Sequence, residues 1–185
     1  GQGSQYVGMC KAFYDQYPIA RQLFEEADDA LGFSLTKMCF EGPEADLRLT
    51  YNTQPAILTA STICGEILKQ HGVSADIAAG HSLGEYSALV NAGAMKFADA
   101  VRIVRQRGQF MQEAVPVGEG SMSAVMGLAN EKIVEICQQV ETETGLPVQA
   151  VNFNCPGQVV IAGATAAVDK ANEEMKAAGA KRCIV

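Results

Sequence analysis

The chain has 185 residues, a length that fits one domain or one domain with a small companion. Hydrophobic residues make up 48% and charged residues 19%, a composition that is typical of folded proteins and excludes a disordered chain. The net charge of −7, from 14 basic and 21 acidic side chains, disfavours a nucleic-acid coat or a binder of anionic membranes, and no apolar run is long enough for a membrane span.

The first 118 residues are predicted to be rich in helix. Apolar residues recur there at helical spacing, and glycines follow the ends of three of the predicted helices. These helices are expected at residues 18–31, 54–71, 84–92 and 97–115, with Pro55 in the first turn of the second. A short apolar run at Ile77–Ala79 predicts a buried strand. This part of the chain is therefore expected to belong to an α/β domain.

The pattern changes at Gly118–Gly120, which we expect to be a domain boundary. The segments that follow are read in the order strand, helix, strand, strand, helix, strand. They span residues 121–128, 130–144, 148–153, 158–162, 165–178 and 180–185. This βαββαβ order is that of the ferredoxin-like arrangement. The sequence therefore predicts two domains, at 1–118 and 119–185.

The six cysteines form no CxxC pair and show no spacing typical of zinc ligands. Because most stand among apolar neighbours, we expect buried, reduced thiols in a cytoplasmic protein, with no metal site. The chain has no signal-peptide pattern at its start. It begins at Gly1 without a methionine and stops within the apolar run Cys183–Val185, so we expect a fragment of a longer protein.

The segment Gly80–Gly84 reads G-x-S-x-G between the predicted strand and helix, the context of a nucleophile elbow. Such a turn is strained, and small residues at Gly80 and Gly84 would allow the chain to cross itself. Ser82 would then stand at a helix N-terminus, where the N–H of Leu83 faces an oxyanion. A chance glycine turn before a helix is the alternative.

A serine nucleophile needs a base, and the two histidines are poor candidates. His81 adjoins Ser82, but neighbouring side chains at a tight elbow point in different directions, so we expect a packing or hydrogen-bonding role. His71 stands at the end of a predicted helix, where it would interact with the helix dipole.

Arg107 is the second unusual residue. On the helix predicted at 97–115 it falls about 40° from the centre of the apolar face, whereas Arg102 lies on the opposite side. A guanidinium directed into an apolar stripe needs an anionic partner. The partner is either a carboxylate of the protein or the carboxylate of a ligand.

Five segments together resemble the malonyl-CoA:acyl carrier protein transacylase family of bacterial-type fatty acid synthesis. The N-terminal one, taken alone, reads as a mobile tail. The matching segments are GQGSQ (Gly1–Gln5), NTQPAI (Asn52–Ile57), GHSLGEYSALV (Gly80–Val90), RGQFMQ (Arg107–Gln112) and NFNCPGQVVIAG (Asn152–Gly163). The resemblance implies part of an α/β-hydrolase-like subdomain at 1–118 and a ferredoxin-like inserted subdomain at 119–185.

The resemblance also implies roles for single residues. Ser82 would be the nucleophile, the backbone N–H groups of Gln2 and Leu83 would form the oxyanion hole, and Arg107 would hold the free carboxylate of the malonyl group. The base in such enzymes is a histidine on the loop after the last strand of the insert, and this chain has no counterpart of it.

The implied activity is malonyl transfer from coenzyme A to the phosphopantetheine thiol of acyl carrier protein, through an acyl-enzyme on Ser82. No cofactor is expected, since the coenzyme A thioester is the substrate. Partners would be malonyl-CoA and acyl carrier protein, with no nucleic acid or membrane. Since carrier proteins are typically acidic, a local basic patch would dock them, with Arg102 and Arg105, or Lys181 and Arg182, as candidates.

Three other functions share features of this sequence. A serine hydrolase would use the same elbow, but its pocket has no use for Arg107. An acyltransferase domain of a multienzyme synthase would differ in context and not in chemistry. A non-catalytic module that docks carrier proteins is favoured by the missing base and disfavoured by the cost of a strained elbow.

Overall fold

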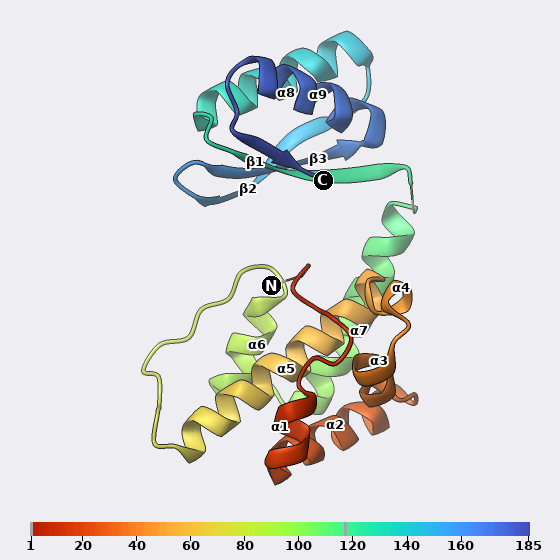
Figure 1. Cartoon of the computed structure of the whole chain (residues 1–185), viewed down its shortest axis with the longest axis vertical. Helices are drawn as coiled ribbons and strands as arrows, with labels where there is room; N and C mark the ends of the chain where they lie inside the picture. Colours follow the sequence, from red (N-terminus) through yellow and green to blue (C-terminus); the bar gives the residue numbers. More distant parts are fainter. Residues whose placement is uncertain (1, 117) are drawn as a thin grey trace. The chain divides into compact units, whose positions relative to one another are not determined.

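The computed structural model describes residues 2–116 and 118–185, and it separates into two compact units, Gly1–Ala114 and Val115–Val185. The chain is of the mixed α/β class, with helices and a four-stranded antiparallel sheet (Figure 1). We describe each unit by itself. Within the described residues, no helix is long and apolar enough to cross a membrane.

In the first unit, the described residues form helices joined by loops. In chain order they are α1 (Lys11–Gln16), α2 (Pro18–Leu31), α3 (Leu35–Glu41), α4 (Glu44–Leu47), α5 (Thr50–Gln70), α6 (Gly84–Asn91) and α7 (Phe97–Ala114). The prediction for α2 is confirmed at both ends, because Pro18 fits the first turn and Gly32 adopts the left-handed conformation after the last. The short helices α1, α3 and α4 carry too few turns to show a period, and the sequence did not predict them.

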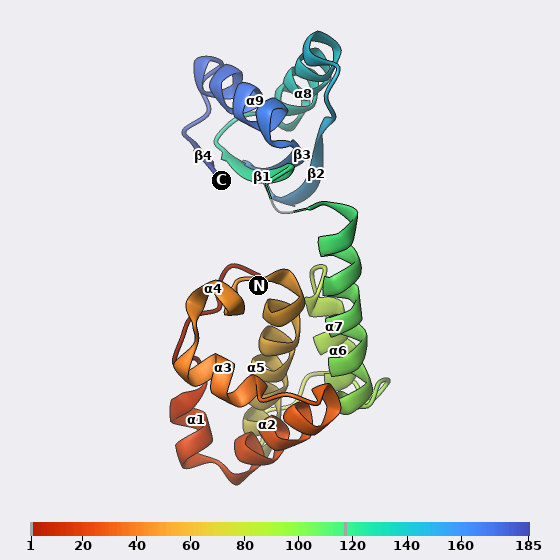
Figure 2. The ribbon, with the colours of Figure 1, turned by 90° about the vertical axis from the view of Figure 1, so that its right-hand side faces the viewer.

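Helix α5 is the centre of this unit and packs against α2, α6 and α7 (Figures 1 and 2). It starts at Thr50, four residues before the predicted start, so Pro55 lies inside the helix and not in its first turn. A proline has no N–H for the carbonyl four residues earlier, here that of Tyr51. Arg105 of α7 fills this gap, because its Nη1 donates to the Tyr51 carbonyl oxygen at 2.9 Å.

The strand predicted at Ile77–Ala79 is not formed. The segment between α5 and α6 is an irregular, exposed loop, and Ile77 is 87% exposed (Figure 1). An apolar run predicts burial, but a strand also needs a neighbouring strand to pair with its backbone. No described residue of the first unit is in a strand, so that pairing is missing.

The second unit contains β1 (Gly120–Met126), α8 (Asn130–Thr144), β2 (Val148–Cys155), β3 (Gln158–Ala164), α9 (Thr165–Ala177) and β4 (Arg182–Ile184). The strand order in the sheet is β2-β3-β1-β4, with all neighbours antiparallel. The predicted bounds of α8 are confirmed, and the predicted order of strands and helices is observed.

Both helices of the second unit cover the same face of its sheet (Figures 1 and 2). Their apolar sides and the inward residues of the strands form one core, which includes Val125, Ile133, Ile161 and Met175. The opposite face is more open, with Met122 51% exposed.

The cysteines are all free thiols, and they differ in burial. Cys39 and Cys137 are buried, as predicted, whereas Cys64 and Cys155 are exposed, which contradicts the prediction. Apolar neighbours in sequence do not ensure burial, because consecutive residues of a helix or strand point in different directions. Among the described residues, no cluster of three metal-ligating side chains occurs.

Candidate active site

Ser82 occupies a strained turn directly before α6. Its φ of 52° lies in the left-handed region, which is rare for a residue other than glycine and costs about 1–3 kcal/mol. The side chain is exposed, and Leu83, which follows it, is the N-cap of α6 and is buried. The turn therefore presents the Ser82 hydroxyl at the positive end of a helix.

Gly80 is the residue that permits this turn. A Cβ atom at this position would lie 1.9 Å from the carbonyl carbon and oxygen of Gly84, a distance that real Cβ atoms do not reach. The prediction that Gly84 must also be small is not supported, because a Cβ there would meet no atom within 4 Å. The backbone segments at Gly80 and Gly84 thus pass so close that Gly80 has no room for a side chain, whereas Gly84 has room for one.

Arg107 reaches the Ser82 hydroxyl from α7. Its Nη2 donates to Ser82 Oγ at 3.0 Å, its Nη1 donates to Gln54 Oε1 at 2.6 Å, and the guanidinium lies 5.9 Å from the Tyr86 ring centroid. No carboxylate of the described residues pairs with it. Of the two anionic partners that its position predicts, a carboxylate of the protein is therefore not found.

Gln54 holds the guanidinium of Arg107 in place through this hydrogen bond, a role that was not predicted from the sequence. Its side chain is fully buried in α5, where Nε2 donates to Thr50 Oγ1 at 3.2 Å and to Met111 Sδ at 3.4 Å. The sequence signal that could have found it is a glutamine within a largely apolar predicted helix, since an amide that becomes buried needs hydrogen-bond partners.

The oxyanion residues predicted by the resemblance lie in two loops. The N–H of Leu83 donates no hydrogen bond within the described residues, so it is free for a ligand. The Gln2 side chain joins the site indirectly, because its Nε2 donates to Thr50 Oγ1 at 2.9 Å. Gly1, the first residue of the GQGSQ motif, lies outside the described residues.

Neither histidine hydrogen-bonds to Ser82 Oγ, whose described partner is Arg107. His81 is exposed, so the packing alternative of its expected packing or hydrogen-bonding role is not supported. His71 is the C-cap of α5, as its sequence position predicted, and its ring meets that of Tyr17 edge-on at 6.3 Å.

Comparison with known proteins matches the chain over residues 1–185 to the acyl transferase domain. The chain belongs to the acyl transferase domain family. It is 53% identical over 184 residues to the malonyl CoA-acyl carrier protein transacylase of Bacillus subtilis, and 52% identical over 185 residues to that of Escherichia coli K12. These alignments cover 100% of this chain but 58% and 59% of the relatives, so the chain spans about three fifths of their length.

Solved structures agree with this assignment. The transacylase of Coxiella burnetii superposes with a TM-score of 0.94 at 45% identity, covering 100% of this chain and 58% of that one. A malonyl-transacylase solved with a type II polyketide acyl carrier protein superposes with a TM-score of 0.93 at 49% identity, covering 100% and 59%. The resemblance inferred from the five motifs is confirmed.

Within this acyl transferase domain, Arg105 is engaged in internal contacts. Its guanidinium lies between the rings of Phe33 and Tyr51, at 4.9 Å and 4.6 Å, and also donates to Asn52 Oδ1. Burial lowers the pKa of Arg105. Arg105 is half-buried and occupied by these contacts, so we no longer count it among the residues predicted to dock a carrier protein. The other three candidates, Arg102, Lys181 and Arg182, are exposed.

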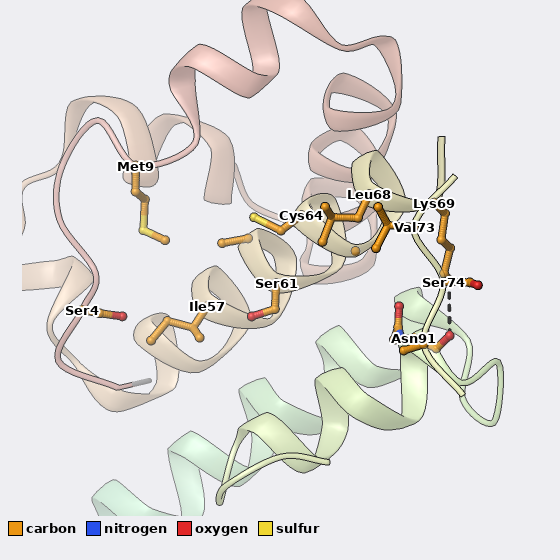
Figure 3. Close-up of a pocket in the computed structure, with 13 residues that line it drawn as sticks. Ser4, Met9, Ile57, Ser61, Cys64, Leu68, Lys69, Val73, Ser74 and Asn91 are labelled. Carbon is orange, nitrogen blue, oxygen red and sulfur yellow. Dashed lines mark hydrogen bonds between the residues drawn. The ribbon is translucent and has the colours of Figure 1, made fainter. Parts of the chain in front are cut away.

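The described residues of the first unit line hollows on its surface, of which two bear on the site. One, of about 650 Å³, is lined by a side of α5 that includes Ile57, Ser61 and Cys64 and by the loop after α5 (Figure 3). Lys69, near the end of α5, donates there to the Asn91 carbonyl oxygen of α6. Ser82 and Arg107 do not line this hollow. A smaller hollow, of about 440 Å³, is lined by Arg107, Phe110 and Met111 among others. Arg107 lines this second hollow and Ser82 lines neither, so we place the candidate site at the contact between Arg107 and Ser82, next to the second hollow.

Proposed function

We propose that the chain carries the nucleophile and the carboxylate-binding arginine of a malonyl-CoA:acyl carrier protein transacylase. The observation that supports this most directly is the 3.0 Å contact between Arg107 Nη2 and Ser82 Oγ. It places a cation that pairs with no carboxylate of the described residues beside the atom that would receive the acyl group. A short acyl group that ends in a carboxylate would then be attached at Ser82 and paired at Arg107.

The proposed reaction has two steps. Ser82 Oγ attacks the thioester carbonyl, and the carbon–sulfur bond breaks. Coenzyme A is released as the free thiol, and the malonyl group remains on Ser82 as an ester. The phosphopantetheine thiol of acyl carrier protein then attacks this ester, which forms the malonyl thioester of the carrier protein and frees the Ser82 hydroxyl. No cofactor takes part, since the coenzyme A thioester is itself the substrate.

In this proposal, the N–H groups of Leu83 and Gln2 stabilise the oxyanion of each tetrahedral intermediate. Arg107 donates to the hydroxyl oxygen of Ser82 and leaves the hydroxyl proton free for a base. The family resemblance implies that this base is a histidine on the loop after the last strand of the inserted subdomain. His71 and His81 are not assigned this role.

The finer fold description belongs to the same proposal. Residues 1–118 would be part of an α/β-hydrolase-like subdomain, and residues 119–185 would be the ferredoxin-like insert, whose strand order β2-β3-β1-β4 is that of the arrangement. Fatty acid synthesis from malonyl-CoA would place the protein in the cytoplasm. Acyl carrier protein is the proposed partner, and Arg102, Lys181 and Arg182 are the exposed basic candidates for docking.

The proposal is tested by acylating the intact protein with malonyl-CoA or acetyl-CoA and mapping the adduct by mass spectrometry. We expect malonyl on Ser82, transferable to carrier-protein pantetheine. Arg107→Ala should lose about 2–5 kcal/mol of transition-state stabilisation for malonyl, because an unpaired carboxylate is left beside the serine, and far less for acetyl. Arg107→Lys keeps the positive charge but not the planar fork of donors, so its rate of malonyl transfer should lie between those of wild type and Arg107→Ala.

Equal losses for both acyl groups in Arg107→Ala would make the arginine a structural residue and remove the support for malonyl. An adduct on another residue would refute the role of Ser82. Loss of the acyl group to water in preference to pantetheine would favour the serine hydrolase alternative.

A further inference from the structure

Thr50, the first residue of α5, joins the two halves of the candidate site through one hydroxyl. Its Oγ1 accepts a hydrogen bond from Gln2 Nε2 at 2.9 Å and another from Gln54 Nε2 at 3.2 Å. Gln2 lies on the loop proposed to supply an oxyanion N–H. Gln54 holds the guanidinium of Arg107. The chain of contacts therefore runs from the oxyanion loop to the nucleophile.

The orientation of the Gln54 amide decides where Arg107 points. A guanidinium has donors only, so the amide must turn its oxygen to Arg107 and its NH₂ group away. The NH₂ group then faces Thr50 Oγ1 and Met111 Sδ. A thioether is a weak acceptor, so the Thr50 hydroxyl is the stronger of the two contacts that keep the amide in this orientation.

The backbone that carries the Thr50 side chain is packed tightly against α7. A Cβ atom on Gly108 of α7 would lie 2.9 Å from the Thr50 carbonyl oxygen, which shows that the two helix backbones touch here. Tyr51, the next residue of α5, accepts a hydrogen bond from Arg105 of α7 at its carbonyl oxygen. The first turn of α5 is thus fixed against the helix that carries Arg107.

We infer that Thr50 is a positioning residue for malonyl transfer. Its hydroxyl fixes the Gln54 amide, and so the aim of Arg107 at the malonyl carboxylate, and it anchors the oxyanion loop through Gln2. This inference rests on the proposed function. It predicts that the hydroxyl, and not the size of the side chain, controls the preference for malonyl over acetyl groups.

The test compares Thr50→Val, which keeps the shape and removes the hydroxyl, with Thr50→Ser, which keeps the hydroxyl. Single-turnover acylation of Ser82 by malonyl-CoA and by acetyl-CoA is measured in the intact protein. We expect Thr50→Val to slow malonyl acylation about 10-fold, the effect of losing two neutral hydrogen bonds, and acetyl acylation by a smaller factor, because acetyl loses only the contribution of the Gln2 contact. Thr50→Ser should stay within about threefold of wild type for both.

Thr62→Val is the matched control. Thr62 lies on the same helix and donates to the Leu58 carbonyl oxygen at 2.9 Å, with no contact to the Ser82 site. The same substitution there removes a hydroxyl from α5 and should leave the malonyl-to-acetyl ratio unchanged. Thermal unfolding of each variant separates a loss of folded protein from a loss of selectivity, since unfolding lowers both acylation rates equally.

Two results would overturn the inference while the proposed function stands. One is a malonyl-to-acetyl ratio in Thr50→Val equal to that of wild type. The other is a Thr50→Ser variant that loses as much as Thr50→Val, which would assign the effect to the methyl group. If wild-type Ser82 takes up no malonyl at all, the proposed function falls and this inference falls with it.

Discussion

Ser82 combines a strained backbone with the hydroxyl that we propose as the nucleophile. Its backbone is left-handed, with φ of 52°, its hydroxyl is exposed, and the N–H of the following Leu83 donates to no group of the described residues. The strain persists because the neighbouring backbone is packed at van der Waals limits around Gly80. Strain at Ser82 supports the proposed catalytic role, since a pure docking surface gains nothing from it.

The two glycines of the elbow are predicted to differ in their tolerance of a side chain. Gly80→Ala drives a Cβ into the Gly84 backbone and should lower the free energy of unfolding by at least about 3 kcal/mol. A turn displaced by an ångström should also slow Ser82 acylation about 100-fold. Gly84→Ala meets open space and should leave both quantities close to wild type.

Urea unfolding and single-turnover acylation of the two variants measure this difference. A tolerated alanine at Gly80 would show that the turn opens without cost. Equal damage at both positions would assign the effect to chain flexibility in place of the close approach.

At the scale of elements, the pairing of α5 with α7 positions the site. Pro55 interrupts the hydrogen-bond ladder of α5, and Arg105 of α7 supplies the donor that the Tyr51 carbonyl lacks. Two residues further along α7, Arg107 donates to Gln54. The carbonyl that Pro55 leaves without a donor in α5 thus receives one from α7, and this contact fixes the register of the two helices next to Ser82.

A double-mutant cycle tests this completion. Arg105→Met should destabilise the protein by about 1–3 kcal/mol, because it leaves the Tyr51 carbonyl without a donor. In the Pro55→Ala background, the N–H of the new alanine bonds to the same carbonyl, so the cost of Arg105→Met should shrink by about 1 kcal/mol or more. Urea unfolding of the four proteins gives the coupling. Additive costs would mean that the aromatic contacts of Arg105 matter and its carbonyl contact does not.

At the scale of the whole molecule, each unit has its own apolar core, and each core holds a buried thiol. Burial raises the pKa of Cys39 from 9.0 to about 12, with smaller effects of Cys10 and Asp28, and burial raises the pKa of Cys137 to about 11. The folded protein therefore keeps these protons at a pH where the unfolded chain releases them. By linkage, the stabilisation is complete below about pH 9 and is lost as the pH rises towards the folded pKa values.

We therefore predict that the free energy of unfolding falls between pH 8.5 and pH 10.5. Cys39→Ala and Cys137→Ala should each flatten this fall, although each creates a small cavity and lowers stability at pH 7. Cys155→Ala, at an exposed position, is the control and should not change the slope. Urea unfolding across this pH range gives the measurement, and identical slopes in all four proteins would contradict the assignment.

The sequence by itself determined the elements whose signals are local. Helix α2 has proline and glycine at its ends, α8 has a regular apolar period, and the elbow has its glycines around Ser82. Such signals act through neighbouring residues, so they can be read along the chain. Helical spacing also singled out Arg107, and the family motifs, whose order along the chain is specific, added the malonyl carboxylate as its expected partner.

Tertiary structure alone decided which distant residues meet. The start of α5 at Thr50, the burial of Gln54 and the capture of the Tyr51 carbonyl all depend on α7, more than 50 positions away. The exposed loop at Ile77 shows the converse, because an apolar run forms a strand only where another strand pairs with it. The pattern of residues along the chain encodes the helical period and the ends of helices. The contacts between residues far apart in the sequence are decided by how α5 and α7 pack against each other.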